Sequence, residues 1–304
     1  MNSPSLPIKR DVRRAFGAAA ARYDDHAFLQ REVADRLLAR LAYVKIDPAR
    51  VLDMGCGTGY VTHELRKHYP RAQVIALDLA AEMLRHAAAA YRAASGAYLT
   101  ALFKRVRPAL VCADAEAMPF ADACLDMIVS NLALQWCDPQ TVSREAARTL
   151  RPNGLFIFTT FGPDTLKELR AAFSRTDGGN HVNRFVDMHD IGDLLVHAGF
   201  ADPVMDQETI TLTYTELRKL LVELKGIGAH NVLPDRSRGL MGKSRWQRMV
   251  SAYEDYRVDG RLPATYEVVY GHAWMPAFGK RQDMAGQKAI PLKEFKRMLG
   301  SSSS

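Results

Sequence analysis

The chain has 304 residues, of which 48% are hydrophobic and 25% are charged, and its formal net charge is +7. This composition is ordinary for a soluble globular protein with a large core, and no stretch reaches the ~20 apolar residues of a membrane span. The positive charge favours an acidic partner, although solubility alone would also account for it. The four cysteines are scattered, without a CxxC pair or a Cys/His cluster. This argues against a metal site or a disulfide framework and predicts a cytoplasmic protein.

In chain order, a helical segment comes first and is followed by an alternation of short apolar runs and helical patterns. Residues Lys9–Tyr43 carry apolar side chains at helical spacing. The predicted strands are Val51–Met54, Val74–Asp78, Leu110–Asp114, Leu125–Ser130 and Leu155–Phe161. The predicted helices between them are Tyr60–His68, Ala81–Ala94 and Gln140–Leu150. Such alternation specifies an α/β fold, with a parallel sheet covered by helices on both faces.

The pattern changes after Phe161, where helices predominate. They are predicted over Asp164–Ser174, Asp187–Ala198, Thr215–Lys225 and Arg245–Tyr256, with strands over Glu208–Tyr214 and Leu262–Ala273. We therefore divide the chain into an N-terminal helical cap (1–44) and a core (45–161). The rest of the core (162–276) carries an inserted helical lid and the two terminal strands, and the tail (277–304) is expected to be disordered.

A glycine-rich segment, VLDMGCGTGY over Val51–Tyr60, follows the first predicted strand and opens a helix. Glycines allow a sharp turn and a close approach of the backbone to a ligand. The spacing is G-x-G-x-G, with Tyr60 where a dinucleotide fingerprint would have its third glycine. Asp53, just before the glycines, suits a ligand with an amine better than one with a pyrophosphate. The segment therefore predicts a site for a ligand other than a dinucleotide.

Three further polar positions follow predicted strands. Asp78 ends the second strand, where a carboxylate binds ribose hydroxyls in nucleoside-binding α/β folds, although it would equally cap the next helix. Asp114 ends the third strand and is placed to accept a hydrogen bond from an adenine amino group. The fourth strand runs into the polar residues Asn131 and Gln135. Because the carboxyl ends of parallel strands form the ligand side of an open sheet, we expect these groups to surround one ligand.

Over roughly Ala15–Phe161, these residues resemble the class I methyltransferases, which use S-adenosylmethionine. The resemblance implies a Rossmann-like, seven-stranded, mostly parallel sheet that ends in an antiparallel pair. It also implies that Asp53 and the glycine loop hold the methionine part of the cofactor, Asp78 the ribose, Met83 the adenine face and Asp114 its amino group. Asn131 and Gln135 would face the methyl group. The expected cofactor contacts are Tyr23, Asp53, Gly55, Cys56, Gly57, Gly59, Asp78, Leu79, Met83, Asp114, Ala115, Asn131 and Gln135.

Segments outside this core narrow the resemblance. They are FGAAAARYDDHAFLQ (Phe16–Gln30), SNLALQWC (Ser130–Cys137), FGPDTLKELRAAF (Phe161–Phe173), HVNRF (His181–Phe185), LKGIGAHN (Leu224–Asn231) and YEVVYGHAW (Tyr266–Trp274). Together they resemble the malonyl-acyl carrier protein O-methyltransferases of biotin synthesis, which methylate the free carboxylate of a malonyl thioester. The resemblance implies that Tyr23 closes over the cofactor and that an acyl carrier protein is the partner, with no nucleic acid and no membrane.

A clamp for the acceptor's carboxylate and thioester is expected in the inserted part. The candidates are Arg184, His181 and Asn183, with Lys167 and Arg170 behind them, although the last two also fit one face of an exposed helix. A malonyl carboxylate is ionised at neutral pH, so no catalytic acid or base is expected. Arg148 and Arg151, with Arg175 or Lys219, are candidates for docking an acidic carrier protein.

Three alternatives stay open at this point. A related mitochondrial assembly factor of complex I, an arginine hydroxylase, has a similar core and similar FGPDTLKELR and PATYEVVY segments, but HVNRF and LKGIGAHN fit it less well. A methyltransferase for another free carboxylic acid is the second alternative. A cofactor-binding protein without catalysis is the third, although no basic motif interleaved with aromatic residues supports RNA binding. The sequence leaves open the oligomeric state, the carrier preference and the contacts to the pantetheine arm.

Overall fold

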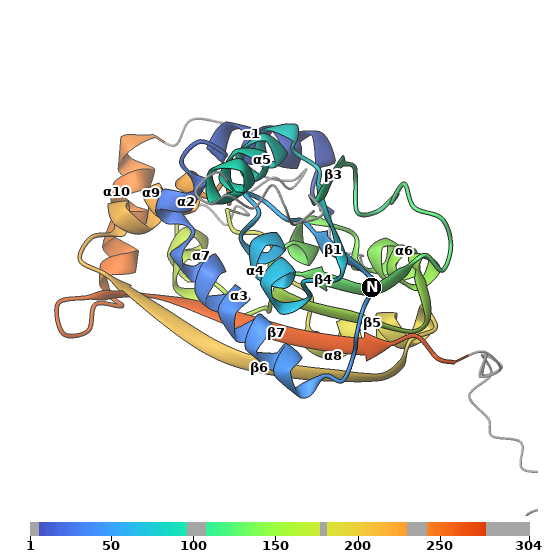
Figure 1. Ribbon diagram of the computed structural model, residues 1–304. Coiled ribbons are helices and arrows are strands. Elements are labelled where there is room, and N and C mark those ends of the chain that lie inside the picture. Colours follow the sequence, from blue (N-terminus) through green and yellow to red (C-terminus); the bar gives the residue numbers. More distant parts are fainter. Residues whose placement is uncertain (1–5, 96–107, 177–180, 230–241, 278–304) are drawn as a thin grey trace, which may run out of the picture.

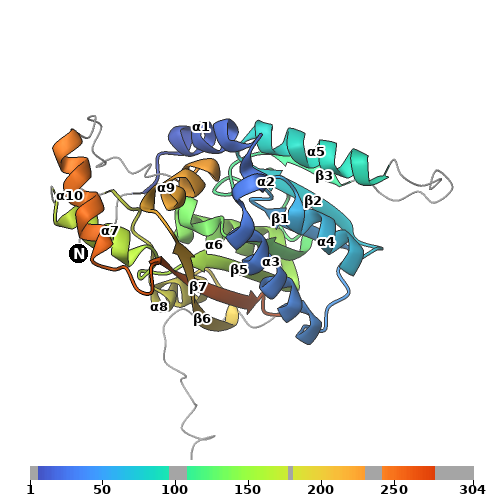
Figure 2. The same ribbon diagram turned by 90° about the vertical axis from the view of Figure 1, so that its left-hand side faces the viewer.

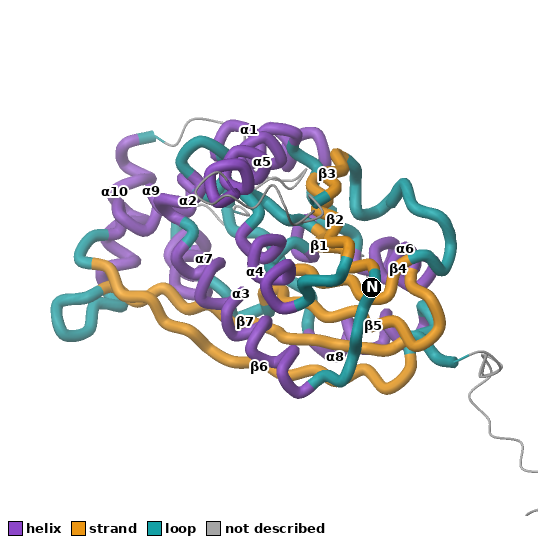
Figure 3. The backbone as a smooth tube through the Cα atoms, in the orientation of Figure 1, coloured by secondary structure: helices purple, strands orange, loops and turns teal. Residues whose placement is uncertain are grey.

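The computed structural model describes residues 6–95, 108–176, 181–229 and 242–277, and these contain a single mixed sheet. The strand order is β3-β2-β1-β4-β5-β7-β6 (Figures 1 and 3). The strands are β1 (Arg50–Met54), β2 (Gln73–Asp78), β3 (Ala109–Cys112), β4 (Leu125–Ser130), β5 (Leu150–Phe161), β6 (Ala201–Tyr214) and β7 (Leu262–Trp274). Residues 278–304 of the predicted tail lie outside the described residues, as do residues 230–241 between the predicted helices Thr215–Lys225 and Arg245–Tyr256.

The first five strands are parallel, whereas β7 is antiparallel to both of its neighbours. The chain leaves β1 for β2 on one side and later returns as β4 on the other, which creates a switch point at the carboxyl ends of β1 and β4. Ligands of open α/β sheets bind at such points. The expected seven-stranded, mostly parallel sheet with an antiparallel end is therefore confirmed.

Helices cover both faces because the strand side chains alternate between two hydrophobic clusters. In β4, Met127 and Val129 join the cluster under α3 (Phe28–Arg40) and α4 (Tyr60–His68), and Ile128 joins the opposite one. The opposite cluster lies under α6 (Pro139–Thr149) and α8 (Met188–His197). A fifth covering helix, α5 (Ala81–Ser95), packs on β2 and β3.

Three inserted helices gather beyond the carboxyl end of β5. They are α7 (Lys167–Ser174), which follows β5, and α9 (Leu217–Gly226) and α10 (Lys243–Glu254), which lie between β6 and β7. Figure 2 shows α10 beside α7, and α9 beneath the N-terminal helix. The close approach of α9 to that helix depends on Gly228, since a Cβ there would lie 3.2 Å from the carbonyl oxygen of Ala15.

The N-terminal segment differs from the single helical stretch that its pattern predicts. It forms α1 (Lys9–Ala19), α2 (Tyr23–His26) and α3, with a short 3₁₀ turn at Leu41–Tyr43. The break places Tyr23 at the start of α2 instead of within one continuous helix. Strand β6 begins seven residues earlier than the pattern predicts, because it pairs with β7 along most of its length.

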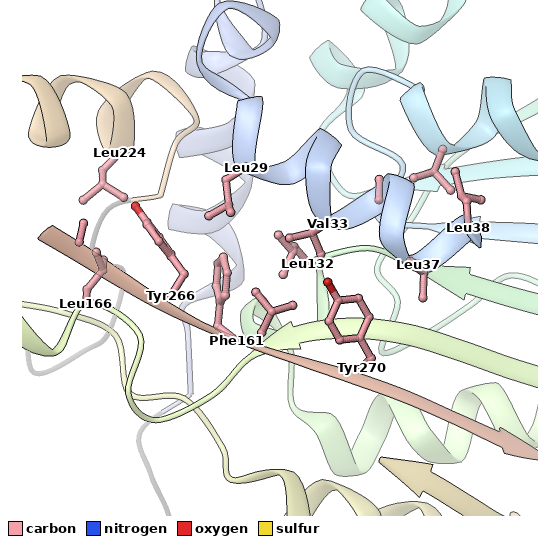
Figure 4. Close-up of a cluster of buried hydrophobic side chains, with 14 of the residues drawn as sticks. Leu29, Val33, Leu37, Leu38, Leu132, Phe161, Leu166, Leu224, Tyr266 and Tyr270 are labelled. Carbon is pink, nitrogen blue, oxygen red and sulfur yellow. The ribbon is translucent and has the colours of Figure 1, made fainter. Parts of the chain in front are cut away.

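Helix α3 packs on the antiparallel end of the sheet, where its apolar side chains contact those of β5 and β7 (Figure 4). Leu37 is fully buried, and burial of a leucine side chain contributes about 1.5–3 kcal/mol. At the rim, Arg36 donates to Glu208 at 2.9 Å, and the Arg40 guanidinium lies 3.6 Å from the ring centre of Tyr270. The cap and the strands that frame the insertion are thus one packed unit.

Candidate functional site

The glycine loop lies between β1 and α4 and has a left-handed backbone at each of its three glycines. The φ angles of Gly55, Gly57 and Gly59 are +77°, +54° and +91°. A Cβ on Gly55 would lie 2.3 Å from the Cβ of Ala133, so that glycine permits close contact with the segment after β4. A Cβ on Gly57 would lie 4.0 Å from a ring carbon of Tyr23, which is an ordinary van der Waals distance. The loop therefore leaves exposed backbone beside an aromatic ring.

A buried carboxylate, Asp53, and a half-buried one, Asp78, lie against this loop. Asp78 accepts hydrogen bonds from the backbone N–H of Gly57 at 2.9 Å and of Ala80 at 2.8 Å. Asp53 is 1% exposed and accepts one from Thr62 Oγ1 at 2.5 Å. Burial and the nearby Asp78 raise the pKa of Asp53 to about 7, against the Thr62 hydrogen bond, which lowers it. Asp78 therefore binds the loop and caps the turn into α5, and its contact to a ribose stays a prediction.

These carboxylates give the loop negative charge that a cationic ligand would neutralise. Within the described residues, neither Asp53 nor Asp78 has an ion-pair partner. A buried carboxylate without a cation is costly, and an added positive charge removes that cost. S-adenosylmethionine carries two such charges, an ammonium and a sulfonium, so the residues present fit this cofactor. Cys56 is buried in the same place, and burial together with the two carboxylates raises the pKa of its thiol.

The cap helices close over the loop. Asp24 on α2 accepts a hydrogen bond from Thr58 Oγ1 in the glycine loop at 2.8 Å. Helix α1 approaches α5 at Gly17, where a Cβ would lie 2.9 Å from a carboxylate oxygen of Glu82. The buried Met83 packs with Ala20 and with the rings of Phe16 and Tyr23. Burial and the charge of Asp78 raise the pKa of Tyr23, which keeps its phenol neutral.

A salt bridge joins the start of α1 to the predicted adenine end of the site. The ammonium of Lys9 lies 3.0 Å from Asp114 Oδ1 and 2.7 Å from Glu116 Oε1. The same Asp114 oxygen accepts the backbone N–H of Glu116. Leu79 and Ala115, beside these groups, are half-buried. Both of these contacts use Oδ1 of Asp114, so a ligand could bind to Oδ2. The predicted contact of Asp114 to adenine stays a prediction.

A pocket of about 450 Å³ extends from Tyr23, whose ring lies near Gly57 of the glycine loop, to the inserted helices. Its walls are mainly apolar, and Figure 4 shows Leu224, Leu166, Tyr266, Phe161 and Leu132 one after another along them. Its polar lining residues are Tyr23, Gln30, Gln135, Thr165, His181, Asn183 and Lys225. Since Leu132 adjoins Ala133 at the glycine loop, the pocket begins where a bound methyl donor would end.

Two leucines in this wall have strained backbones. The φ angles of Leu132 and Leu166 are +49° and +56°, values that bulky side chains rarely adopt. Leu166 precedes α7, which is why that helix begins at Lys167 instead of at Asp164. The guanidinium of Arg170 supports this turn by donating to the carbonyl oxygens of Pro163 and Thr165. Such strain persists where the surroundings impose it, and it concentrates at functional sites.

Of the five residues predicted to bind the methyl acceptor, the structure places some in the pocket wall and others outside it. His181 and Asn183 line the pocket, with His181 stacked on Phe173. Arg170 is occupied by the turn, Lys167 forms an exposed pair with Asp164, and Arg184 is exposed and outside the lining. Only the first two therefore have direct access to the cavity.

Asn131 and Gln135 are tied to the protein itself. Asn131 donates to the backbone oxygen of Gln30 at 3.0 Å and accepts from Thr159 at 2.8 Å, which joins α3 to β4 and β5. Gln135 donates to the Leu132 oxygen and accepts from Thr160, but it also lines the pocket. A contact of Asn131 to the methyl group stays a prediction, whereas its role in holding α3 follows from the geometry.

Lys225 and Gln30 are among the polar pocket residues that were not singled out from the sequence. Lys225 lines the pocket from an exposed position, without an ion-pair partner among the described residues. Gln30 has a buried Oε1 without a hydrogen-bond partner in that same part of the chain. Both belong to segments that carry the family resemblance, but neither has a local pattern that indicates a ligand contact.

The predicted docking arginines do not form one surface. Arg148 is bound by Glu145 and Asp122, and Arg151 pairs with Asp126 near the start of β5, at the opposite end of that strand from the pocket. Arg175 pairs with Asp255. The prediction overlooked these local acidic partners, which only the tertiary structure brings close.

Among its side chains and helices, the described part of the chain has neither a metal-binding cluster nor a membrane-spanning helix. It contains no group of three or more side chains arranged to hold a metal ion. None of its helices is long and apolar enough to span a membrane.

Comparison with known proteins agrees with this geometry. Residues 52–158 match a family model described as a methyltransferase domain. The YcgJ protein from Bacillus subtilis superposes with a TM-score of 0.55 at 16% identity, over 79% of this chain and 97% of that one, which supports the fold alone.

Two bacterial relatives carry a more specific name. A malonyl-[acyl-carrier protein] O-methyltransferase from Laribacter hongkongensis is 56% identical over 91% of this chain and 92% of its own length. A protein of the same name from Gallionella capsiferriformans is 54% identical over 88% of this chain and 91% of its own. The resemblance therefore extends through the cap and the insertion, which favours the carboxyl methyltransferase over the arginine hydroxylase. The chain belongs to the malonyl-[acyl-carrier protein] O-methyltransferase family.

Proposed function

We propose that the protein transfers a methyl group from S-adenosylmethionine to the free carboxylate of a malonyl group carried on acyl carrier protein. The product would be the malonyl methyl ester at the start of pimeloyl and biotin synthesis. The observation that carries this proposal is the apolar pocket that continues from Tyr23, at the glycine loop, to Lys225 at its exposed rim. Membership of the family supports the choice of acceptor.

Cofactor binding is the task of the glycine loop in this proposal. Asp53 supplies negative charge for the cationic methionine part of the cofactor, and Asp78 supplies a hydrogen-bond acceptor for its ribose hydroxyls. The neutral ring of Tyr23 covers both carboxylates. Lys9 fastens α1 over the adenine end through Asp114. A site closed in this way excludes water, which strengthens each electrostatic contact inside it.

The chemistry requires alignment more than proton transfer. The acceptor is ionised at neutral pH, and its oxygen forms the new bond to the methyl carbon as the carbon–sulfur bond breaks. Bound S-adenosylmethionine supplies the methyl group and a neutral thioether leaving group. Holding two reacting groups in line contributes up to ~7–11 kcal/mol toward such a barrier. The packed wall of Phe161, Leu166 and Tyr266 provides this alignment.

Acceptor binding would use both neutral and charged groups. His181 and Asn183 lie in the pocket wall, whereas Lys225 stands at its rim. A cation at the rim attracts an acidic carrier protein without pairing with the reacting oxygen, whose nucleophilicity is thereby preserved. Arg184 is exposed and remains a candidate for the same attraction.

Methyl transfer from labelled S-adenosylmethionine tests the proposal. We expect transfer to malonyl-carrier protein, much less to succinyl-carrier protein, and least to free malonate. Rescue of a biotin-requiring strain lacking its own methyltransferase provides the cellular counterpart. If malonyl-carrier protein accepts no label while another free acid does, the acceptor is wrong and the protein is a methyltransferase of a different carboxylic acid.

A further inference from the structure

An unsatisfied amide lies in the wall of the acceptor pocket. Asn183 is 8% exposed and lines the cavity, yet its Oδ1 has no hydrogen-bond partner within the described residues. Leaving a buried acceptor unpaired is unfavourable, and native proteins seldom do so without a reason. A donor on a molecule bound in the pocket would satisfy this acceptor atom.

The backbone around Asn183 holds this amide in place. On one side, His181 stacks on Phe173 with ring centres 4.1 Å apart and an angle of 15°. On the other, Phe185 meets Phe161 edge-on at 5.7 Å. Val182, between them, is buried. Because both flanks pack on the pocket wall, the surrounding side chains determine the position of Asn183.

The identity of the donor follows from the chemistry of the acceptor, and this step rests on the proposed function. A malonyl thioester offers only hydrogen-bond acceptors, namely the carboxylate and the carbonyl oxygen. The first donor beyond them is the N–H of the amide two carbons from the sulfur, in the pantetheine arm. The donors of the cofactor belong instead at the glycine loop and at Asp114.

We propose that Asn183 Oδ1 accepts a hydrogen bond from the N–H of the first amide of the pantetheine arm. The contact fixes the distance from the arm to the reacting carboxylate. It selects acceptors carried on pantetheine over free acids, and it assigns Asn183 to recognition of the arm instead of the malonyl carboxylate.

A comparison of two small acceptors isolates this contact. Malonyl-N-acetylcysteamine thioester contains the amide, and an analogue with CH₂ in place of its N–H retains the same length and carbonyl group. For the unmodified protein we expect kcat/KM to be about 10-fold higher with the amide, as for one hydrogen bond to a buried group. In Asn183→Leu this ratio should fall to about 1, because leucine offers no acceptor.

Two further variants separate the contact from packing. Val182→Ala alters the neighbouring buried side chain and should lower both rates while keeping the ratio near 10. Asn183→Asp retains an acceptor oxygen, so it should preserve the preference even where both rates fall. Asn183→Leu should melt no lower than the unmodified protein, because it removes an unsatisfied group.

The outcomes distinguish this proposal from the broader one. An unchanged ratio in Asn183→Leu overturns the arm contact and means that water or another group satisfies the amide oxygen. If the unmodified protein methylates neither thioester, the proposed function fails. In that case the binding of acetyl-N-acetylcysteamine thioester and its CH₂ analogue, followed by ligand-detected NMR, decides the contact. Equal binding by the unmodified protein and Asn183→Leu would overturn it.

Discussion

The glycine loop and the acceptor pocket meet at Tyr23 and Leu132, but they are built from different kinds of contact. The loop consists of ten consecutive residues, and its backbone meets two carboxylates at strand ends, Asp53 within the loop and Asp78 at the end of β2. The pocket draws side chains from the cap, the end of β5, the loop from His181 to Phe185, α9 and β7. One is local and polar, and the other is assembled from distant segments and is mainly apolar.

Because of this difference, we expect substitutions in the two regions to have different effects. A loop made of backbone atoms has little tolerance for change, because any added Cβ enters the space of a neighbour or of the ligand. A pocket made of apolar side chains tolerates substitution and changes its selectivity instead. Changes in the loop should therefore abolish cofactor binding, whereas changes in the pocket should alter the acceptor or the stability.

The largest effect is expected for Gly55→Ala. Its Cβ would lie 2.3 Å from that of Ala133, and its φ of +77° is unfavourable for alanine. The strain and the overpacking together amount to about 3 kcal/mol, which corresponds to a loss of about 100-fold in affinity for S-adenosylhomocysteine. Isothermal titration calorimetry provides the measurement.

Two controls assign that loss to the contact. Gly260→Ala has a comparable φ of +73° but nothing within 4 Å of the added Cβ, so it should cost about 1–2 kcal/mol of stability and leave affinity unchanged. Combining Gly55→Ala with Ala133→Gly removes the clash and should recover part of the affinity. No recovery in the double variant would show that contact with Ala133 is not the cause.

The next largest effect concerns the charge of Asp53. Its pKa of about 7 means that the free protein is largely protonated there below pH 7, whereas a cationic ligand favours the carboxylate. Affinity for S-adenosylmethionine should therefore rise with pH up to about 7 and then level off. Asp53→Asn should weaken binding by about 10-fold above pH 7, as for loss of one charge-assisted hydrogen bond, and abolish this pH dependence.

Stability should change in the opposite direction with pH. Between the ordinary pKa of 3.8 and about 7, the folded protein retains a proton at Asp53 that the unfolded chain has lost. The free energy of unfolding contributed by this group therefore falls as pH rises through that range. Thr62→Val removes the hydrogen bond that lowers the pKa, so it should shift both profiles to higher pH. Profiles that do not move would mean that another group titrates.

The same contrast explains what could be predicted from the sequence. Strand β4 and helix α4 have the predicted bounds, and Asp53 and Asp78 lie at the glycine loop, because periodicity and glycine spacing are local signals. The break in the N-terminal helix, the pairing of Arg148 and the place of Lys225 at the pocket depend on segments far apart in the chain. From their charge alone, Lys167 and Arg170 were predicted to have the same role in acceptor binding. In the structure Lys167 forms an exposed ion pair, whereas Arg170 binds two backbone oxygens.

A pair of substitutions on α7 tests that difference. Arg170→Met removes two hydrogen bonds to the turn around the strained Leu166 and should cost about 1–3 kcal/mol of stability, with a lower kcat/KM for the acceptor. Lys167→Met, on the same helix, loses only an exposed pair with Asp164 and should cost less than about 0.5 kcal/mol. Urea denaturation measures both. Equal effects would mean that Arg170 does not support the turn.

The smallest effect is expected at the junction of the cap and the cofactor site. Lys9 and Asp114 each retain roughly a quarter of their side-chain exposure, so solvent screens their attraction. Lys9→Met should therefore raise KM for S-adenosylmethionine only about 2- to 5-fold, and more at low salt than at high salt. Arg10→Met, which changes a neighbouring exposed residue, is the matched control and should have no effect. If Lys9→Met instead tightens cofactor binding, the bridge competes with adenine for Asp114, and the cap opposes binding at this end of the site instead of assisting it.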